Sequence, residues 1–223
     1  MGDPLIFYFD FLLANYRGSF EVIGTDRMNI IYEIKFGLEF QAIYCLNYPS
    51  ETELREDHTN GLLAHRLSKE CLLVDGALRL EPDIFSGLAR GNFALSKKTS
   101  EDLSLASCSD IDLVPFELGK NRTPFYTAII TNVIDVRDRE LIKRNKTNPL
   151  PFNHPNRSFI DPNHPLLNRS MFFKMVRLGS LNNLLSSQIF FAQNDGGEGY
   201  NFLSKANALG LTGFQTIEIC RSH

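Results

Sequence analysis

Two histidines, His154 and His164, are the first candidates for chemistry, because each lies in the same tripeptide, Asn-His-Pro. Imidazole can bind a metal ion or act as a general base, so one alternative is a small metal-dependent nuclease or hydrolase that uses this pair. Zinc sites usually combine more closely spaced histidines with cysteine or carboxylate ligands, and only Asp161 lies between these two. Each proline also holds the preceding residue in an extended conformation. We therefore favour two histidines in a turn-rich loop.

Other catalytic patterns are incomplete. Residues 196–199 are rich in glycine and precede a predicted helix, but they lack the Lys-Ser/Thr ending of a P-loop, and Asp195 and Glu198 would repel a phosphate. No G-x-S-x-G nucleophile elbow is present. The widely spaced cysteines are typical of reduced core thiols: Cys45, Cys71, Cys108 and Cys220. We expect no catalytic residues, no metal, no cofactor and no enzymatic activity.

Charge is distributed unevenly along the chain. The formal net charge is −3, but residues 1–120 hold 11 Lys/Arg and 19 Asp/Glu, whereas residues 121–177 hold 10 and 4. Because Lys and Arg attract phosphates, a nucleic-acid-binding module is a further alternative. The cluster that would serve it is Arg137, Arg139, Lys143, Arg144 and Lys146. The chain lacks a recognised nucleic-acid-binding motif and is acidic overall, which argues against this alternative. We favour the interpretation that the acidic and basic regions face each other inside the fold, or that one of them binds a protein partner.

Composition and the apolar runs indicate a soluble globular protein. Of the 223 residues, 43% are hydrophobic and 22% are charged. No stretch approaches the ~20 apolar residues of a membrane span. Residues 1–16 lack the basic start and the small-residue cleavage site of a secretory signal. We expect a cytoplasmic location without a membrane partner.

Short strands and helices must position these groups. Three helices are predicted: one at residues 62–70, one capped by Ser96 or Thr99 with acidic residues in its first turn, and one at 200–209 that Gly210 closes. An Asp-Gly turn predicts a hairpin over residues 71–80. Pro115 predicts that a strand at 111–118 lies at a sheet edge or contains a bulge. Besides the two strands of this hairpin, the predicted strands are 20–23, 29–36, 38–46, 93–95, 111–118, 125–136, 171–178, 188–192 and 214–219.

A long loop interrupts this pattern. Residues 143–170 hold five of the ten prolines and six asparagines, which excludes a helix or a central strand. The sum is an α+β fold with a mixed or mainly antiparallel sheet, short helices and a long Asn/Pro-rich loop. We divide the chain into a strand-rich region, residues 1–90, which is separate or belongs to the same unit, and an α+β domain, residues 91–223.

Three short motifs occur in a fixed order: Phe-Ala-Leu-Ser at residues 93–96, Val-Ile-Asp at 133–135 and Gly-Leu-Thr-Gly-Phe at 210–214. From Asn92 to Ile219 the sequence thereby resembles a widespread bacterial family of immunity proteins, long catalogued as a domain of unknown function. Its members are encoded beside polymorphic or secretion-system toxins, such as those of type VI secretion. The resemblance implies a non-enzymatic protein that binds and neutralises a cognate toxin through the toxin's C-terminal toxic domain.

The densest acidic run supplies candidates for partner binding. It lies in the polar connection between a predicted strand and the first predicted helix and comprises Glu51, Glu53, Glu56 and Asp57. Complementary charge speeds and orients the encounter of two proteins, so these residues would suit a basic toxin surface. For any one of them, a solvated loop is the alternative.

Overall fold

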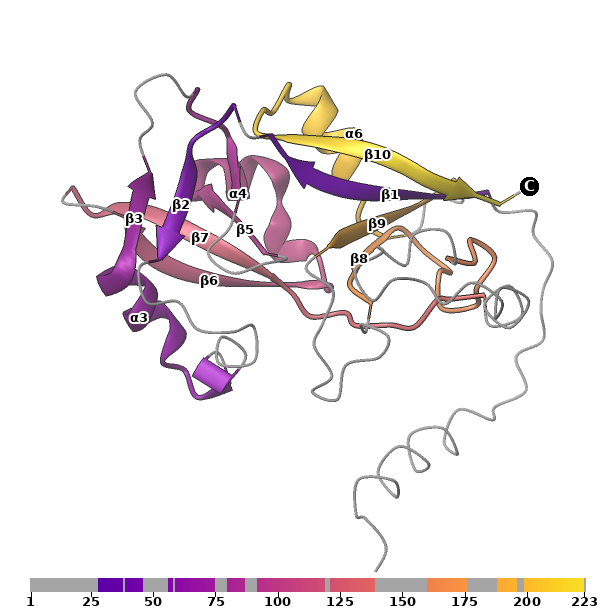
Figure 1. Ribbon diagram of the computed structural model, residues 1–223, viewed down its shortest axis with the longest axis horizontal. Helices are drawn as coiled ribbons and strands as arrows, with labels where there is room; N and C mark the ends of the chain where they lie inside the picture. Colours follow the sequence, from indigo (N-terminus) through magenta and orange to yellow (C-terminus); the bar gives the residue numbers. More distant parts are fainter. Residues whose placement is uncertain are drawn as a thin grey trace, which may run out of the picture.

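The computed structural model describes residues 28–37, 39–45, 56–57, 59–74, 80–86, 92–118, 121–138, 160–175, 188–195 and 199–222. Within these residues the chain forms two β-sheets with a few short helices (Figure 1). The predicted α+β class is confirmed. None of the helices in this part of the chain is long and apolar enough to cross a bilayer. The predicted strand at 20–23 lies outside the described residues.

The smaller sheet has four antiparallel strands in the order β10-β1-β9-β8. β1 (Asn29–Phe36) lies between β9 (Ile189–Asn194) and β10 (Phe214–Arg221), and β8 (Met171–Phe173) pairs with the other side of β9. β1 is rich in isoleucine and aromatic residues, which suits a central strand that is covered on both faces. Its predicted bounds are confirmed.

The larger sheet has six strands in the order β3-β2-β4-β5-β7-β6, and its one parallel pair is β2 with β4. Each sheet contains strands from residues 1–90 and strands from residues 91–223. The six strands are β2 (Ala42–Cys45), β3 (Cys71–Val74), β4 (Ile84–Ser86), β5 (Phe93–Ser96), β6 (Ile111–Leu118) and β7 (Thr123–Ile130).

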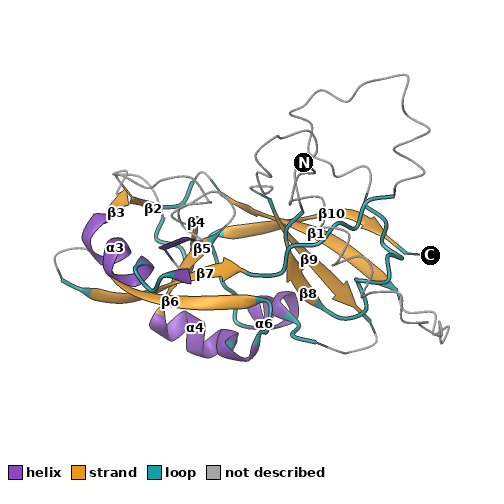
Figure 2. Cartoon of the chain, turned by 90° about the horizontal axis from the view of Figure 1, so that it is seen from below, coloured by secondary structure: helices purple, strands orange, loops and turns teal. Residues whose placement is uncertain are grey.

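β6 is an edge strand, as Pro115 predicts. α3 (Leu63–Glu70) packs beside it (Figure 2). The Glu117 backbone N–H donates to Ser68 Oγ on α3 at 3.1 Å. Backbone N–H groups two residues apart on a strand point the same way. Pro115, two positions before Glu117, has no N–H, so β6 lacks a donor at that position on its free edge. The proline and the helix together block strand addition at this edge.

The largest apolar cluster joins the two sheets and two helices, α4 (Lys97–Leu103) and α6 (Phe202–Ala208). Phe172 on β8 lies at its centre. Its ring centroid is 6.1 Å from that of Phe93, 5.0 Å from that of Phe191 and 4.9 Å from that of Phe202. This packing fixes β8 against α6, and with it the segment that precedes β8.

Ser96 caps α4, as predicted: its Oγ accepts a hydrogen bond from Thr99 N at 3.1 Å. The helix therefore begins at Lys97, and Glu101 and Asp102 follow its first turn. The expectation of acidic residues in that first turn was wrong, because it allowed for a cap as late as Thr99.

The structure also differs from the prediction in where one strand ends and in how another strand is paired. β7 ends at Ile130 instead of residue 136, because Thr131 N bonds to Asp110 O and Val133 bridges to Lys174 beside the other sheet. β3 pairs with β2, so the structure gives the 71–74 strand a partner other than the predicted hairpin strand. The Asp-Gly turn of that hairpin lies outside the described residues.

The Gly-Leu-Thr-Gly-Phe segment is a joint between the sheets. Gly210 ends α6 with φ of 63°. Thr212 O accepts from Ile84 N of β4 at 3.1 Å, and Thr212 Oγ1 donates to Asp83 at 2.8 Å. Gly213 has φ of 100°, and a Cβ there would lie 2.1 Å from Ile84 O. The motif serves this close approach of two backbones.

Candidate functional site

Of the four acidic partner candidates, Glu51 and Glu53 lie outside the described residues. Glu56 and Asp57 form a turn that precedes α3, closed by hydrogen bonds from Asn60 N to Glu56 O and from Leu62 N to Asp57 O. The Asp57 carboxylate pairs with Arg66 on α3 at 2.5 Å. Asp57 therefore holds the turn against the helix, whereas the Glu56 side chain is exposed.

We call residues 56–57 and 59–62 the acidic turn. Leu62 in it is 55% exposed, although the next residue, Leu63, is buried in a cluster with Leu67. The start of α3, which directly follows the acidic turn, is thus anchored to the sheet by the burial of Leu63 and Leu67. The acidic turn itself presents a carboxylate, Glu56, and an apolar side chain, Leu62, to solvent.

His154 lies outside the described residues, and His164 lies in a turn at residues 161–167. Its backbone N–H donates to Asp161 O, its carbonyl accepts from Leu167 N, and its Nδ1 accepts from Leu166 N at 3.3 Å. His164 thus helps to close the turn, as the interpretation of a turn-rich loop predicts. Within the described ranges, no three His, Cys, Asp or Glu side chains lie close enough to hold a metal ion.

The basic cluster is represented by Arg137 alone, since its other four members are outside the described residues. Two nitrogens of the Arg137 guanidinium bind the Asp135 carboxylate, at 2.5 and 2.7 Å. Its side chain is 7% exposed. This arginine is therefore engaged within the fold and does not present its charge to a phosphate backbone.

The structure brings together a different group of side chains. A polar hollow of about 450 Å³ opens beside α6, near the short helix η1 (Leu105–Ser107) and Arg169, two positions before β8. α4 and α6 lie side by side there (Figure 2). The residues that line the polar hollow are Ser107, Ser109, Arg169, Gly199, Tyr200, Asn201 and Lys205.

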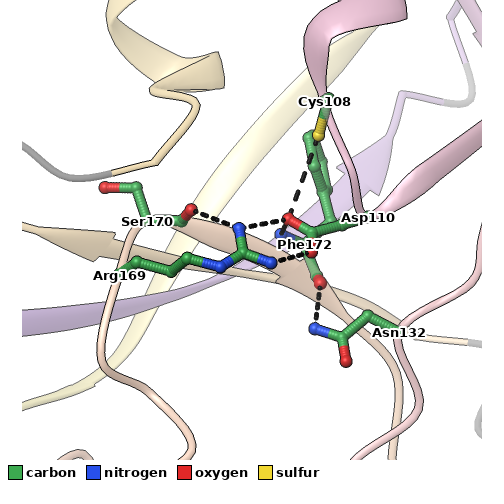
Figure 3. A network of polar contacts seen from close by, with 6 residues as sticks. All are labelled: Cys108, Asp110, Asn132, Arg169, Ser170 and Phe172. Atoms are coloured by element: carbon green, nitrogen blue, oxygen red, sulfur yellow. Dashed lines mark hydrogen bonds and ion pairs between the residues drawn. The ribbon is translucent and has the colours of Figure 1, made fainter.

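Arg169 is held in the wall of the hollow by Asp110 (Figure 3). The two guanidinium-to-carboxylate distances are 2.5 and 3.1 Å, and Phe172 N donates to the same carboxylate at 3.3 Å. The Asp110 side chain is 3% exposed and that of Arg169 is 33% exposed. The hydrogen bonds that Arg169 donates to the Asp110 carboxylate raise the pKa of Arg169. This pair joins residues 1–120, in which acidic side chains predominate, to residues 121–177, in which basic side chains predominate.

Cys108 lies next to Asp110 (Figure 3) and is buried. Its thiol donates to Asp110 Oδ2 at 3.9 Å. Burial raises the pKa of Cys108 from 9.0 to about 11, so the group is a neutral thiol at physiological pH. Cys108 therefore lacks the thiolate that a nucleophile needs.

Lys205 and Tyr200 form the helix side of the hollow. Lys205 Nζ lies 5.1 Å from the Tyr200 ring centroid and 3.4 Å from Leu103 O. The Tyr200 hydroxyl donates to the same carbonyl, and burial raises the Tyr200 pKa. Among the residues that the structure describes, the lining combines two cations with hydroxyl groups and includes no histidine or carboxylate that could act as a base. Such a set can bind an anion.

Gly199 enters the lining for a conformational reason. It has φ of 82° and bridges to Ser170, and a Cβ at Gly199 would lie 2.3 Å from Ser170 O. The glycine at this end of the Gly-rich segment thus allows two backbones to meet. Residues 196–198 are outside the described ranges.

Sequence patterns did not identify the polar hollow, because its parts come from three distant segments. Asn201 carried the one available local signal, as a helix cap whose Oδ1 accepts from Ser204 N at 3.0 Å. Asp110 and Arg169 are separated by 59 positions and carry no local signal of their pairing. No protein-family model matches the chain, and no curated protein matches it significantly.

Proposed function

We propose that the chain is a non-enzymatic immunity protein that binds and neutralises a cognate bacterial toxin. The observation that carries this proposal is the acidic turn, in which the Asp57–Arg66 ion pair holds an exposed Glu56 and an exposed Leu62 beside an anchored helix. The order of short motifs between Asn92 and Ile219 supports the same class of protein.

A turn that is already ordered favours binding, since less conformational entropy is lost when the partner docks. Burial of the exposed part of Leu62 would contribute about 1 kcal/mol to a complex. Glu56 would attract a basic surface on the toxin and orient it during the encounter. The turn thus offers both an apolar contact and a steering charge.

The test is co-expression of this protein with the toxin encoded by the adjacent gene, followed by size-exclusion chromatography and titration calorimetry of the purified pair. We expect restored growth and a stable complex. The double variant Glu56→Lys/Leu62→Glu should weaken the complex at least tenfold, because it reverses the charge and removes the apolar contact.

The matched control is Asp102→Lys/Leu209→Glu, which makes the same kinds of change at an exposed carboxylate on α4 and at an exposed leucine that ends α6. It should bind as the wild type does. Failure of growth rescue together with absence of a complex would reject the immunity function. A complex that tolerates Glu56→Lys/Leu62→Glu would instead reject the acidic turn as the contact.

A further inference from the structure

The polar hollow is separate from the acidic turn: α3 and α6 lie at different places in the molecule (Figure 1). We propose that the hollow is a binding site for a carboxylate group of a peptide or protein, supplied by an acidic side chain or by a chain end. This site is independent of the toxin contact, and it is built by Arg169, Lys205 and two serines.

The charge of the hollow favours an anion. Arg169 is compensated by Asp110, whereas no ion pair joins Lys205 to a carboxylate among the described residues. The partners of the Lys205 ammonium are a backbone carbonyl and an aromatic ring, which are both neutral. The described residues of the site therefore carry about one uncompensated positive charge.

The ion pair with Asp110 also positions Arg169. The carboxylate fixes one edge of the guanidinium, through Nη1 and Nη2. Nε forms no hydrogen bond within the described residues, and a third of the side chain is exposed. A guanidinium that is held in this way keeps a donor for a further oxygen at low entropic cost.

The Ser109 hydroxyl completes the set of donors. The side chains of Ser107 and Ser109 are exposed beside Arg169 and Lys205, but the Ser107 hydroxyl already donates to Ser104 O at 2.8 Å. A hydroxyl can rotate to donate to either oxygen of a carboxylate. A volume of about 450 Å³ is large enough for one amino-acid side chain or a chain terminus.

The single net charge distinguishes a carboxylate from a phosphate. A phosphate carries close to two negative charges at neutral pH, and the buried carboxylate of Asp110 lies directly behind Arg169. A second negative charge would be repelled by Asp110 without a further cation to balance it. A monoanion matches the charge of the site.

The experiment is an NMR titration of the full chain at pH 7 and constant ionic strength. The three probes are N-acetylglutamate α-amide, which has a side-chain carboxylate, N-acetylalanine, which has a terminal carboxylate, and inorganic phosphate. We expect saturable shifts of the amides of Ser107, Ser109 and Lys205 with at least one carboxylate, at a dissociation constant of order 10 mM. The tighter of the two carboxylates identifies the source.

Lys205→Gln should weaken that carboxylate about fivefold, since it removes the uncompensated charge. Lys98→Gln, at an exposed position on α4, is the matched control and should leave the affinity unchanged. The absence of saturable shifts with both carboxylates would overturn the proposal. It would also be overturned by equal affinity in Lys205→Gln, or by tighter binding of phosphate.

Discussion

Two regions of the molecule contain the same residue types in different surroundings. At the junction of the sheets, Asp110 pairs with Arg169 beside Cys108. On the outer strand β10, Glu218 pairs with Arg221 around Cys220. The shortest charge-to-charge distances are 2.5 and 2.6 Å. Distance alone therefore does not distinguish the two pairs.

Burial and separation along the chain do distinguish them. The junction pair joins residues 59 positions apart and includes a carboxylate that is almost fully buried. The β10 pair joins residues three positions apart, with both side chains about 40% exposed. A register shift opposite β1 brings Glu218 and Arg221 to one face of the strand. The comparison shows that the junction pair constrains the fold, whereas the β10 pair remains a surface feature.

The largest effect is expected for Asp110→Ala. It leaves Arg169 without its partner and the buried Phe172 N–H without its side-chain acceptor, so the free energy of unfolding should fall by about 3–5 kcal/mol. Urea denaturation measures this change. Asp102→Asn, at an exposed carboxylate on α4, should change stability by less than about 0.5 kcal/mol.

A double-mutant cycle separates the ion pair from simple loss of packing. Asp110→Leu/Arg169→Met should destabilise the protein less than the sum of the two single substitutions, because neither charge is then left alone in the interior. Additive losses would show that the two side chains do not act as a pair, and the contrast with β10 would disappear.

The second effect concerns the two cysteines. Burial raises the pKa of both Cys108 and Cys220 from 9.0 to about 11. Cys108 is nearly inaccessible, whereas Cys220 is partly exposed. Native labelling with iodoacetamide at pH 8, read from the modified peptides by mass spectrometry, should modify Cys220 at least about tenfold faster, since accessibility then decides the rate. Equal rates would remove this difference between the regions.

The same shifts give a pH dependence. A thiol whose pKa is raised by folding contributes stability that is complete below pH 9 and is lost as the pH rises toward 11. Urea midpoints should therefore fall over that interval. Cys108→Ala should reduce the slope, and an unchanged slope in this variant would show that Cys108 does not titrate there.

The smallest effect is expected for Glu218→Gln. The Arg221 side chain lowers the pKa of Glu218, but both groups are solvated. Thermal unfolding of Glu218→Gln should match the wild type within the error of the measurement, because solvent screens exposed pairs. A clear loss of stability would place β10 in the same class as the junction.

Elements with strong local signals could be predicted from the sequence. The β-branched and aromatic residues of β1, the Ser96 cap and the edge position of Pro115 depend on neighbours within a few residues. Gly210 as the residue that closes α6 is of the same kind. These features were correct because local sterics and hydrogen bonds determine them.

Features that depend on distant contacts could not be predicted. The predicted strand runs past Ile130 because residues 131–136 include two valines and an isoleucine. In the folded chain, the bridge from Val133 to Lys174 takes these residues away from the larger sheet. The polar hollow combines segments around residues 107, 169 and 200. The acidic turn was located from its charge, but the role of Asp57 depends on Arg66 in the folded chain.

The position of β1 has a consequence for the order of folding during synthesis. β1 ends at Phe36 and is made well before its partners. β9 begins 153 residues later, at Ile189, and β10 begins 178 residues later, at Phe214. The six-stranded sheet needs only residues 42–130 and can assemble first on the ribosome. β1 must remain without these partners until β9 emerges, and its second partner, β10, follows later, so closure of the smaller sheet is expected to be the slow step.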